Sequence, residues 1–158
     1  MTIEPHLAHM AGHTIDWLIN HGEAIDCVEI VRVDGQFEER PHFKAGYLPD
    51  ENIVSWHLCN FCCGGLGELV ASGMERVLKN LVNREGFWLE ALLTSEHDAE
   101  LFRLMATRGI GEQLATDLLR AERAIREYLF RVDWERIENT LMADGAVKVY
   151  LSDVMTVH

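Results

Sequence analysis

Residues 26–43 read DCVEIVRVDGQFEERPHF, and this stretch decides the fold class of the chain. Two runs rich in β-branched and aromatic residues flank Asp34 and Gly35, and an Asp-Gly pair favours a tight two-residue hairpin turn. We therefore predict two antiparallel strands, near residues 27–33 and 37–43. The alternating stretch AVKVYL, residues 146–151, has the pattern of a further strand that can join this hairpin.

Much of the remaining chain carries apolar residues at helical spacing. The spacing predicts helices over residues 5–20, 66–82 and 111–131, with shorter helices near 83–92, after Ser95 and from Asp133 to Asp144. Ser95 followed three residues later by Asp98 has the pattern of a capping box. The sequence thus predicts an α+β fold, predominantly α-helical, with about five to six helices packed against a small antiparallel sheet. We expect residues 1–158 to form a single globular domain.

The stretch 111–131 gives the clearest helical pattern in the sequence. Oppositely charged side chains lie four residues apart at Glu122–Arg126 and Glu127–Arg131, a spacing that stabilises helices. We expect this helix to be central to the core. Its predicted buried face consists of Leu114, Leu118, Ala121, Ile125, Tyr128 and Leu129.

Composition and charge limit the classes of function. No apolar run approaches the roughly 18 residues of a membrane span, and the N-terminal residues lack a signal-peptide pattern, so we expect a cytoplasmic protein without a membrane segment. The net charge is −12, and residues 1–75 hold 12 acidic against 3 basic residues. Such a chain repels nucleic acid and would associate readily with a basic protein surface, although the simpler interpretation, which we prefer, is that the acidic residues keep the protein soluble.

The stretch HLCNFCCGGLG, residues 57–67, holds three of the four cysteines. His57, Cys59, Cys62 and Cys63 are ligand types that zinc favours, and Cys27, His21 or His42 can supply a further ligand from the hairpin region. A second interpretation is a reactive thiol, because we expect the cluster at the entrance of a helix, where the pKa of a thiol falls. The third, which we prefer, is plain packing of buried cysteines. The glycines that follow permit close approach of another backbone or an anion.

A second cluster lies in PHLAHMAGHTID, residues 5–16. On a helix His6, His9 and His13 lie within about 60° of one another, beside Asp16 and Asn20. This stripe is a candidate site for a transition metal. A solvated polar face is the interpretation that we prefer, because the stripe lies near a terminus and the glutamate placement of zincin-type helices is absent.

TRGIGEQLATDLL, residues 107–119, resembles the hairpin of helix-hairpin-helix modules, in which backbone N–H groups of a Gly-hydrophobic-Gly turn hold a nucleic-acid phosphate. That resemblance implies a basic residue shortly after the turn. Glu112 and Gln113 stand there instead, so we interpret Gly109 as the cap of a helix in a structural turn.

The sequence shows no complete catalytic constellation. Ser55 and His57 lack an acidic partner, and Glu38 and Glu39 are neighbours on a predicted strand, where their side chains point to opposite faces. Our leading hypothesis is therefore a small regulatory or adaptor domain, more plausibly not an enzyme, that acts by binding another protein. The alternative is a metal-binding or thiol-redox protein centred on residues 57–63.

Overall fold

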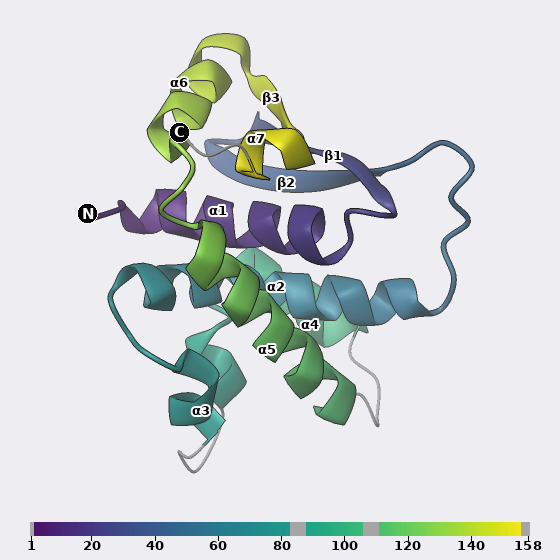
Figure 1. The fold of residues 1–158 in the computed structure, drawn as a ribbon, viewed down its shortest axis with the longest axis vertical. Coiled ribbons are helices and arrows are strands. Elements are labelled where there is room, and N and C mark those ends of the chain that lie inside the picture. Colours follow the sequence, from purple (N-terminus) through teal and green to yellow (C-terminus); the bar gives the residue numbers. More distant parts are fainter. Residues whose placement is uncertain (1, 83–87, 106–110, 156–158) are drawn as a thin grey trace.

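The structure, a computed structural model, describes residues 2–82, 88–105 and 111–155. Within these residues it contains seven α-helices and one three-stranded antiparallel sheet, which confirms the predicted α+β, mostly helical fold. The sheet covers one side of helix α1 (Pro5–Ile15), and helices α2 (Asn52–Ala71) and α5 (Gly111–Tyr128) lie on the other side (Figure 1).

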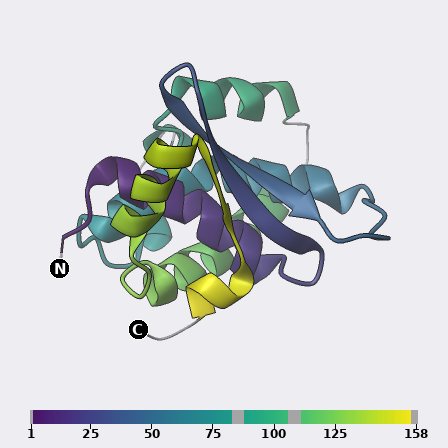
Figure 2. The ribbon, with the colours of Figure 1, turned by 90° about the horizontal axis from the view of Figure 1, so that it is seen from above.

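The sheet consists of the three strands that the sequence predicts. Strands β1 (Ile25–Val33) and β2 (Gln36–Phe43) form the hairpin, and β3 (Ala146–Val149) pairs with the other edge of β1 to give the order β2-β1-β3. Asp34 and Gly35 both have positive φ, 50° and 78°, as a tight hairpin turn of primed type requires. Seen from above, the hairpin crosses the helical layer and its turn lies beside α4 (Glu96–Met105) (Figure 2).

Helix α1 continues without a break into a π-helical turn, Asp16–Asn20, so the predicted helix over 5–20 is confirmed with a local change of winding. The predicted helix over 66–82 is wrong. Helix α2 begins much earlier, at Asn52, and ends at Ala71, where Gly73 takes a φ of 91° before a separate helix α3 (Val77–Val82) begins.

Glycines in α2 explain this error, because they lie inside the helix and not at its start. A Cβ on Gly67 would collide with the carbonyl oxygen of Ala8, and one on Gly12 would collide with the backbone of Cys63. Helices α1 and α2 therefore cross at a distance that only glycine permits at these positions. The close backbone approach that we expected is made by a helix of the same chain.

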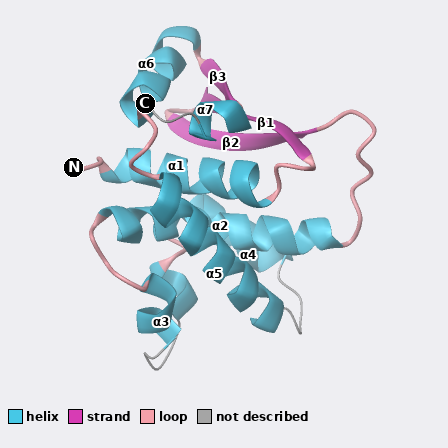
Figure 3. Cartoon of the chain, in the orientation of Figure 1, coloured by secondary structure: helices cyan, strands magenta, loops and turns pink. Residues whose placement is uncertain are grey.

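The remaining elements complete the helical layer (Figure 3). After a 3₁₀ turn at Trp88–Ala91 come α4, α5, α6 (Trp134–Asp144) and, after β3, α7 (Leu151–Met155). Asp133 accepts a hydrogen bond from the backbone N–H of Arg136, and Gly145 ends α6 in the left-handed conformation, as predicted. The predictions for residues 83–87 and for the turn around Gly109 lie outside the described residues.

Helix α5 confirms the predicted central role of residues 111–131, although it ends at Tyr128. The ion pairs Glu122–Arg126 and Glu127–Arg131 are formed, at 3.8 and 3.9 Å. Five of the six predicted apolar residues are buried, and Tyr128 is half-buried against the core: the buried ones are Leu114, Leu118, Ala121, Ile125 and Leu129. Across the described parts of the chain, no helix combines the length and apolarity needed to cross a membrane.

Candidate metal centre

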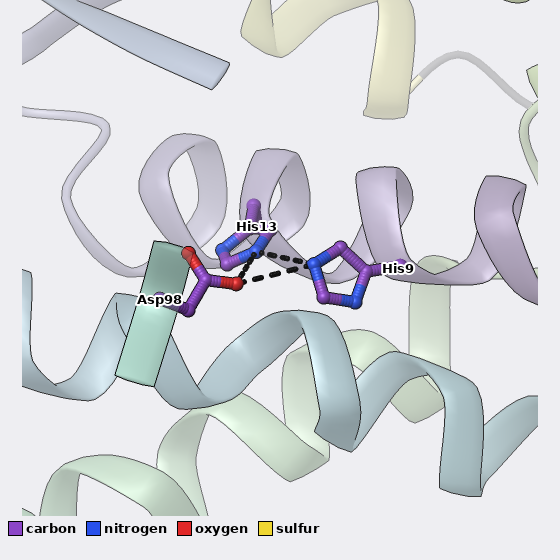
Figure 4. A group of neighbouring side chains, drawn as sticks. All are labelled: His9, His13 and Asp98. Carbon is purple, nitrogen blue, oxygen red and sulfur yellow. Dashed lines mark hydrogen bonds and ion pairs between the residues drawn. The ribbon is translucent and has the colours of Figure 1, made fainter. Parts of the chain in front are cut away.

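Two histidines of α1 and one aspartate of α4 bring three ligand atoms together (Figure 4). Nε2 of His9 and Nε2 of His13 are 3.1 Å apart, and Oδ2 of Asp98 lies 3.2 Å from the first and 3.1 Å from the second. The histidines are one helical turn apart and so project from one face of α1. Asp98 comes from a segment 85 residues further along the chain.

The other nitrogen of each imidazole ring has its own fixed partner. His9 Nδ1 donates to Oε2 of Glu68 at 3.0 Å, and the Thr94 hydroxyl donates to the same oxygen at 2.6 Å. His13 Nδ1 donates to Oδ1 of Asn60 at 3.1 Å. The Asn60 amide cannot be turned round, because its Nδ2 donates to the His13 carbonyl oxygen and to Asp16, each at 3.0 Å.

These partners of the Nδ1 atoms determine whether each Nε2 atom carries a proton or a lone pair. Because each Nδ1 carries a proton, a neutral His9 and a neutral His13 both direct the Nε2 lone pair toward the Asp98 carboxylate. Three lone pairs at about 3 Å repel one another unless a cation lies between them. In the metal-free protein that cation must be a proton. A divalent metal ion is the alternative occupant.

The spacing of the three atoms suits a metal ion. For bonds of about 2.1 Å, atoms 3.1–3.2 Å apart subtend about 95–100° at the metal, between the octahedral and the tetrahedral angle. The second-sphere pattern also fits, since metal-bound histidines generally donate their remaining N–H to a carboxylate or a carbonyl oxygen. Glu68 and Asn60 occupy these two positions.

Gly64 makes room for the two imidazole rings. A Cβ at this position would lie 2.6 Å from Nε2 of His13 and closer still to the ring of His9. Real Cβ atoms do not approach other atoms so closely, so a side chain at this position would have to displace one or both rings from the cluster. The glycine run of α2 thus serves both the packing of the two helices and the site.

The charges of the cluster support each other. Burial lowers the pKa of His13, but the negative charge of Glu39 and the hydrogen bond and charge of Asp98 outweigh it and raise the pKa to about 10. For His9, burial again lowers the pKa, and the hydrogen bonds to Asp98 and Glu68 more than offset it, so that the pKa is raised. Burial would raise the pKa of Asp98, but the two histidines hold it well below its usual value. The site therefore attracts positive charge strongly.

A pocket of about 980 Å³ opens onto this cluster. Its walls come from α1, from the hairpin around residues 33–40, from α2 and from residues 94–101. Glu39 of β2 also lines it. Burial raises the pKa of Glu39, while the charges of His13 and His9 lower it in part. Any metal held by His9, His13 and Asp98 would therefore have coordination positions next to an accessible cavity.

Of the predicted stripe His6, His9 and His13, only His9 and His13 lie together in the cluster. His6 lies on the surface and contacts Glu138 of α6 through Nε2 at 2.6 Å. Of the two other residues of the stripe, Asp16 is buried, and it accepts hydrogen bonds from Asn20 and Asn60. Asp16 therefore helps to hold Asn60, which in turn holds the His13 ring, and it is not one of the three converging ligand residues.

The cysteine cluster lies in the middle of α2, so the prediction of a helix entrance is wrong. Cys59, Cys62 and Cys63 are all buried. Burial raises the pKa of the Cys62 and Cys63 thiols well above the usual value, which is the opposite of the lowering that a helix entrance would produce. His57 packs edge-on against Trp17, with ring centroids 5.0 Å apart, and belongs to no ligand group formed by the described residues.

Asp16, Cys59 and Cys63 nevertheless form a second group whose ligand atoms lie within 4.8 Å of one another. All three residues are buried, and hydrogen bonds already engage the Asp16 carboxylate and the Cys63 thiol. Asp16 accepts from two asparagines, and the Cys63 thiol donates to the Cys59 carbonyl oxygen at 3.2 Å. This group is therefore a weaker candidate for a metal site than the histidine cluster, in which three ligand atoms converge at 3.1–3.2 Å.

The three further ligands suggested by the sequence are dispersed. Cys27 is buried in β1, and His42 pairs with Glu29 at 3.2 Å on the outer side of the hairpin. His21 stacks on Trp56, with ring centroids 4.2 Å apart. None of the three belongs to the ligand groups formed by the described residues.

Asp98, Glu68, Asn60 and Gly64 were missed by the sequence reasoning. Asp98 was interpreted as part of a capping box, and its backbone N–H does donate to Oγ of Ser95 at 3.0 Å. Its carboxylate, however, turns to the histidines. The spacing of His9 and His13 gave the only usable signal, because their partners lie at sequence separations of 47 to 89 residues.

The chain matches no protein-family model, and its comparison with curated protein sequences gave no match. The chemistry of the site is therefore argued from the geometry of its residues.

Proposed function

We propose that this protein binds one divalent transition-metal ion through His9 Nε2, His13 Nε2 and Asp98 Oδ2. The observation that carries the proposal is the convergence of these three atoms at 3.1–3.2 Å while Glu68 and Asn60 hold both Nδ1–H groups away from them. A metal ion would take the place of the proton between these atoms, and both Nε2 atoms are then available to it because the Nδ1–H groups are already bound to Glu68 and Asn60.

The ligand set favours particular metals. Two neutral imidazoles and one carboxylate suit zinc, iron(II), cobalt(II) or nickel(II) better than calcium or magnesium, which prefer oxygen ligands. Zinc is our first choice. Structural zinc sites generally have four protein ligands, whereas catalytic ones have three and keep a position for water or substrate. Three ligands beside a pocket therefore favour a centre at which a small molecule is bound or activated.

Such a metal ion would act as a Lewis acid. It would polarise a carbonyl or a similar group of a bound molecule, or lower the pKa of a bound water molecule. The protein would contribute the fixed orientation of both imidazoles, through Glu68 and Asn60, and a cavity whose walls exclude part of the solvent.

Titration of the metal-free full chain with zinc tests the proposal. We expect binding of one zinc ion per chain, with a marked loss of affinity in His9→Gln and in Asp98→Asn. His6→Gln is the matched control, because His6 lies on the same helix but contacts only Glu138. Circular dichroism of each variant shows whether it folds. Equal zinc affinity in all four proteins, or no binding in the unchanged chain, would contradict the proposal.

The adaptor hypothesis stays a separate proposal, supported by the −9 charge of residues 1–75 and not by the metal cluster. We propose a protein partner with a basic surface, in the cytoplasm. Association with such a partner should slow as salt rises from about 50 to 500 mM, because the screening length falls from roughly 14 to 4 Å. A specific partner whose association rate ignores salt would remove the electrostatic basis of this second proposal.

A further inference from the structure

Acidic side chains dominate the pocket that opens onto the proposed metal centre. Among the described residues that line it, Arg40 is the only lysine or arginine, and its Nη2 and Nε already donate to Oε2 of Glu38, at 2.8 and 3.1 Å. The carboxylates that line the pocket are Asp34, Glu38, Glu39, Glu68, Glu96 and Asp98.

Three of these six carboxylates have partners, and of the other three Asp34 and Glu96 are exposed, whereas Glu39 is half-buried. Glu68 and Asp98 accept hydrogen bonds from the histidines, and Glu38 holds Arg40. Among the described residues, no other side chain donates a hydrogen bond to the Glu39 carboxylate, which accepts one only from its own backbone N–H. Its charge acts on His13 through space, as the strong effect on the pKa of His13 shows.

The position of Glu39 follows from the alternation of β2. Side chains at 37, 39 and 43 share the face of the strand on which Phe37 and Phe43 pack against the core, whereas His42 lies on the other face with Glu29. The Glu39 side chain, on the same face as these two aromatic residues, is half-buried and lines the pocket. Its negative charge is therefore poorly screened by solvent.

We propose that this pocket selects ligands that carry an ammonium or guanidinium group close to a metal-binding atom, and that Glu39 is the residue that receives the cationic group. This inference rests on the proposed metal centre. The metal would hold the donor atom of the ligand, while the acidic wall would attract the positive group and repel carboxylates and phosphates. Amine-bearing small molecules are thus the expected substrate class, and phosphorylated molecules should bind more weakly.

Three imidazole compounds test this selectivity with the cobalt-loaded full chain. Histamine carries a cationic tail, imidazole-4-propionate carries an anionic tail, and 4-ethylimidazole is the neutral reference. Each offers the same ring nitrogen to cobalt, and binding is followed by the change in the visible absorption of the metal. The trimethylammonium derivative of histamine, whose quaternary nitrogen cannot chelate the metal, should show the same preference if the charge of the tail and not chelation causes it. We expect histamine to bind at least about tenfold more tightly than imidazole-4-propionate, with 4-ethylimidazole between them.

Two variants test whether Glu39 causes the preference for the cationic compound. Glu39→Gln should retain cobalt and reduce the histamine preference to about threefold or less. Glu29→Gln is the matched control, because it removes the same charge from the outer side of the same hairpin, where Glu29 pairs with His42. It should leave the preference unchanged.

The outcomes separate the two proposals. Absence of a protein-bound cobalt spectrum in the unchanged chain would overturn the metal centre itself. Cobalt binding with equal affinity for the three compounds would overturn the charge selectivity and leave the metal centre standing. A preference that survives in Glu39→Gln, or a Glu39→Gln variant that loses cobalt and thereby shows Glu39 to be a ligand, would overturn the role assigned to Glu39.

Discussion

At the scale of single residues, Gly64 leaves the space that the imidazole rings of His9 and His13 occupy. An added methyl group must displace the rings of His9 and His13, because its carbon would lie 2.6 Å or less from their Nε2 atoms. We expect Gly64→Ala to destabilise the protein by about 1–3 kcal/mol and to weaken zinc binding severely.

Gly65→Ala provides the comparison for this substitution. Its methyl group would press on the backbone of Leu92 and not on the histidines. Chemical denaturation and zinc titration of both variants separate the two effects: both should lose stability, and only Gly64→Ala should lose most of its zinc affinity. Intact zinc binding in a folded Gly64→Ala variant would show that the rings do not need this space.

The protonation of His13 gives a pH dependence with a definite sign. In the folded metal-free protein the pKa of His13 is raised to about 10, from about 6.5 in an unfolded chain. Protonated His13 therefore stabilises the metal-free fold. That contribution is fully present below pH 6.5 and is lost as the pH rises toward 10.

Zinc must displace the same proton, so its affinity should change in the opposite direction. We expect the affinity to rise by about tenfold per pH unit for each proton displaced, from pH 6 to pH 8.5. Zinc titration in the presence of a competing chelator at several pH values measures this slope. A flat profile over the range would mean that zinc binds at other residues.

At the scale of elements, α5 supports the core without contributing to the site. Leu118 and Ile125 are fully buried on its inner face. Replacing either with alanine leaves a cavity, and we expect the free energy of unfolding to fall by about 2–5 kcal/mol. Arg123 is exposed, and Arg123→Ala should change the stability little. Similar denaturation midpoints for all three variants would contradict the assigned face.

Helix α2 contains thiols that we expect to be inert. Because burial raises the pKa of Cys62 and Cys63, both remain protonated at neutral pH and are shielded from reagents. Alkylation with iodoacetamide should be slow in the native protein at pH 8 and fast after unfolding in urea. Rapid labelling of a cysteine of α2 in the native state, located by peptide mass spectrometry, would restore the reactive-thiol interpretation.

The elements also show how far the sequence was informative. The hairpin could be predicted because Asp34 and Gly35 specify the turn locally, and α5 because its apolar spacing is regular. The start of α2 could not, since glycine discourages a helix in isolation and the compensating contact with Ala8 and Gly12 is tertiary. In the same way, local sequence showed Asp98 as a capping residue and could not show where its carboxylate would point.

At the scale of the whole molecule, the site exists only because several segments meet. Helix α1 supplies the histidines, α2 supplies Asn60, Gly64 and Glu68, α4 supplies Asp98, and the hairpin closes the pocket with Glu39. The sheet lies over α1 and carries this hairpin across the helical layer toward α4 (Figure 2). Spacing within one helix could suggest a pair of ligands, but the third ligand and the pocket are properties of the assembled fold.

The most direct measurement is the anomalous scattering of zinc in a crystal of the zinc-loaded protein. We expect one strong peak per chain, about 2.1 Å from His9 Nε2, His13 Nε2 and an oxygen of Asp98. A peak between Asp16, Cys59 and Cys63 instead, or no peak beside His9 and His13 in a crystal that contains zinc elsewhere, would contradict the proposed centre.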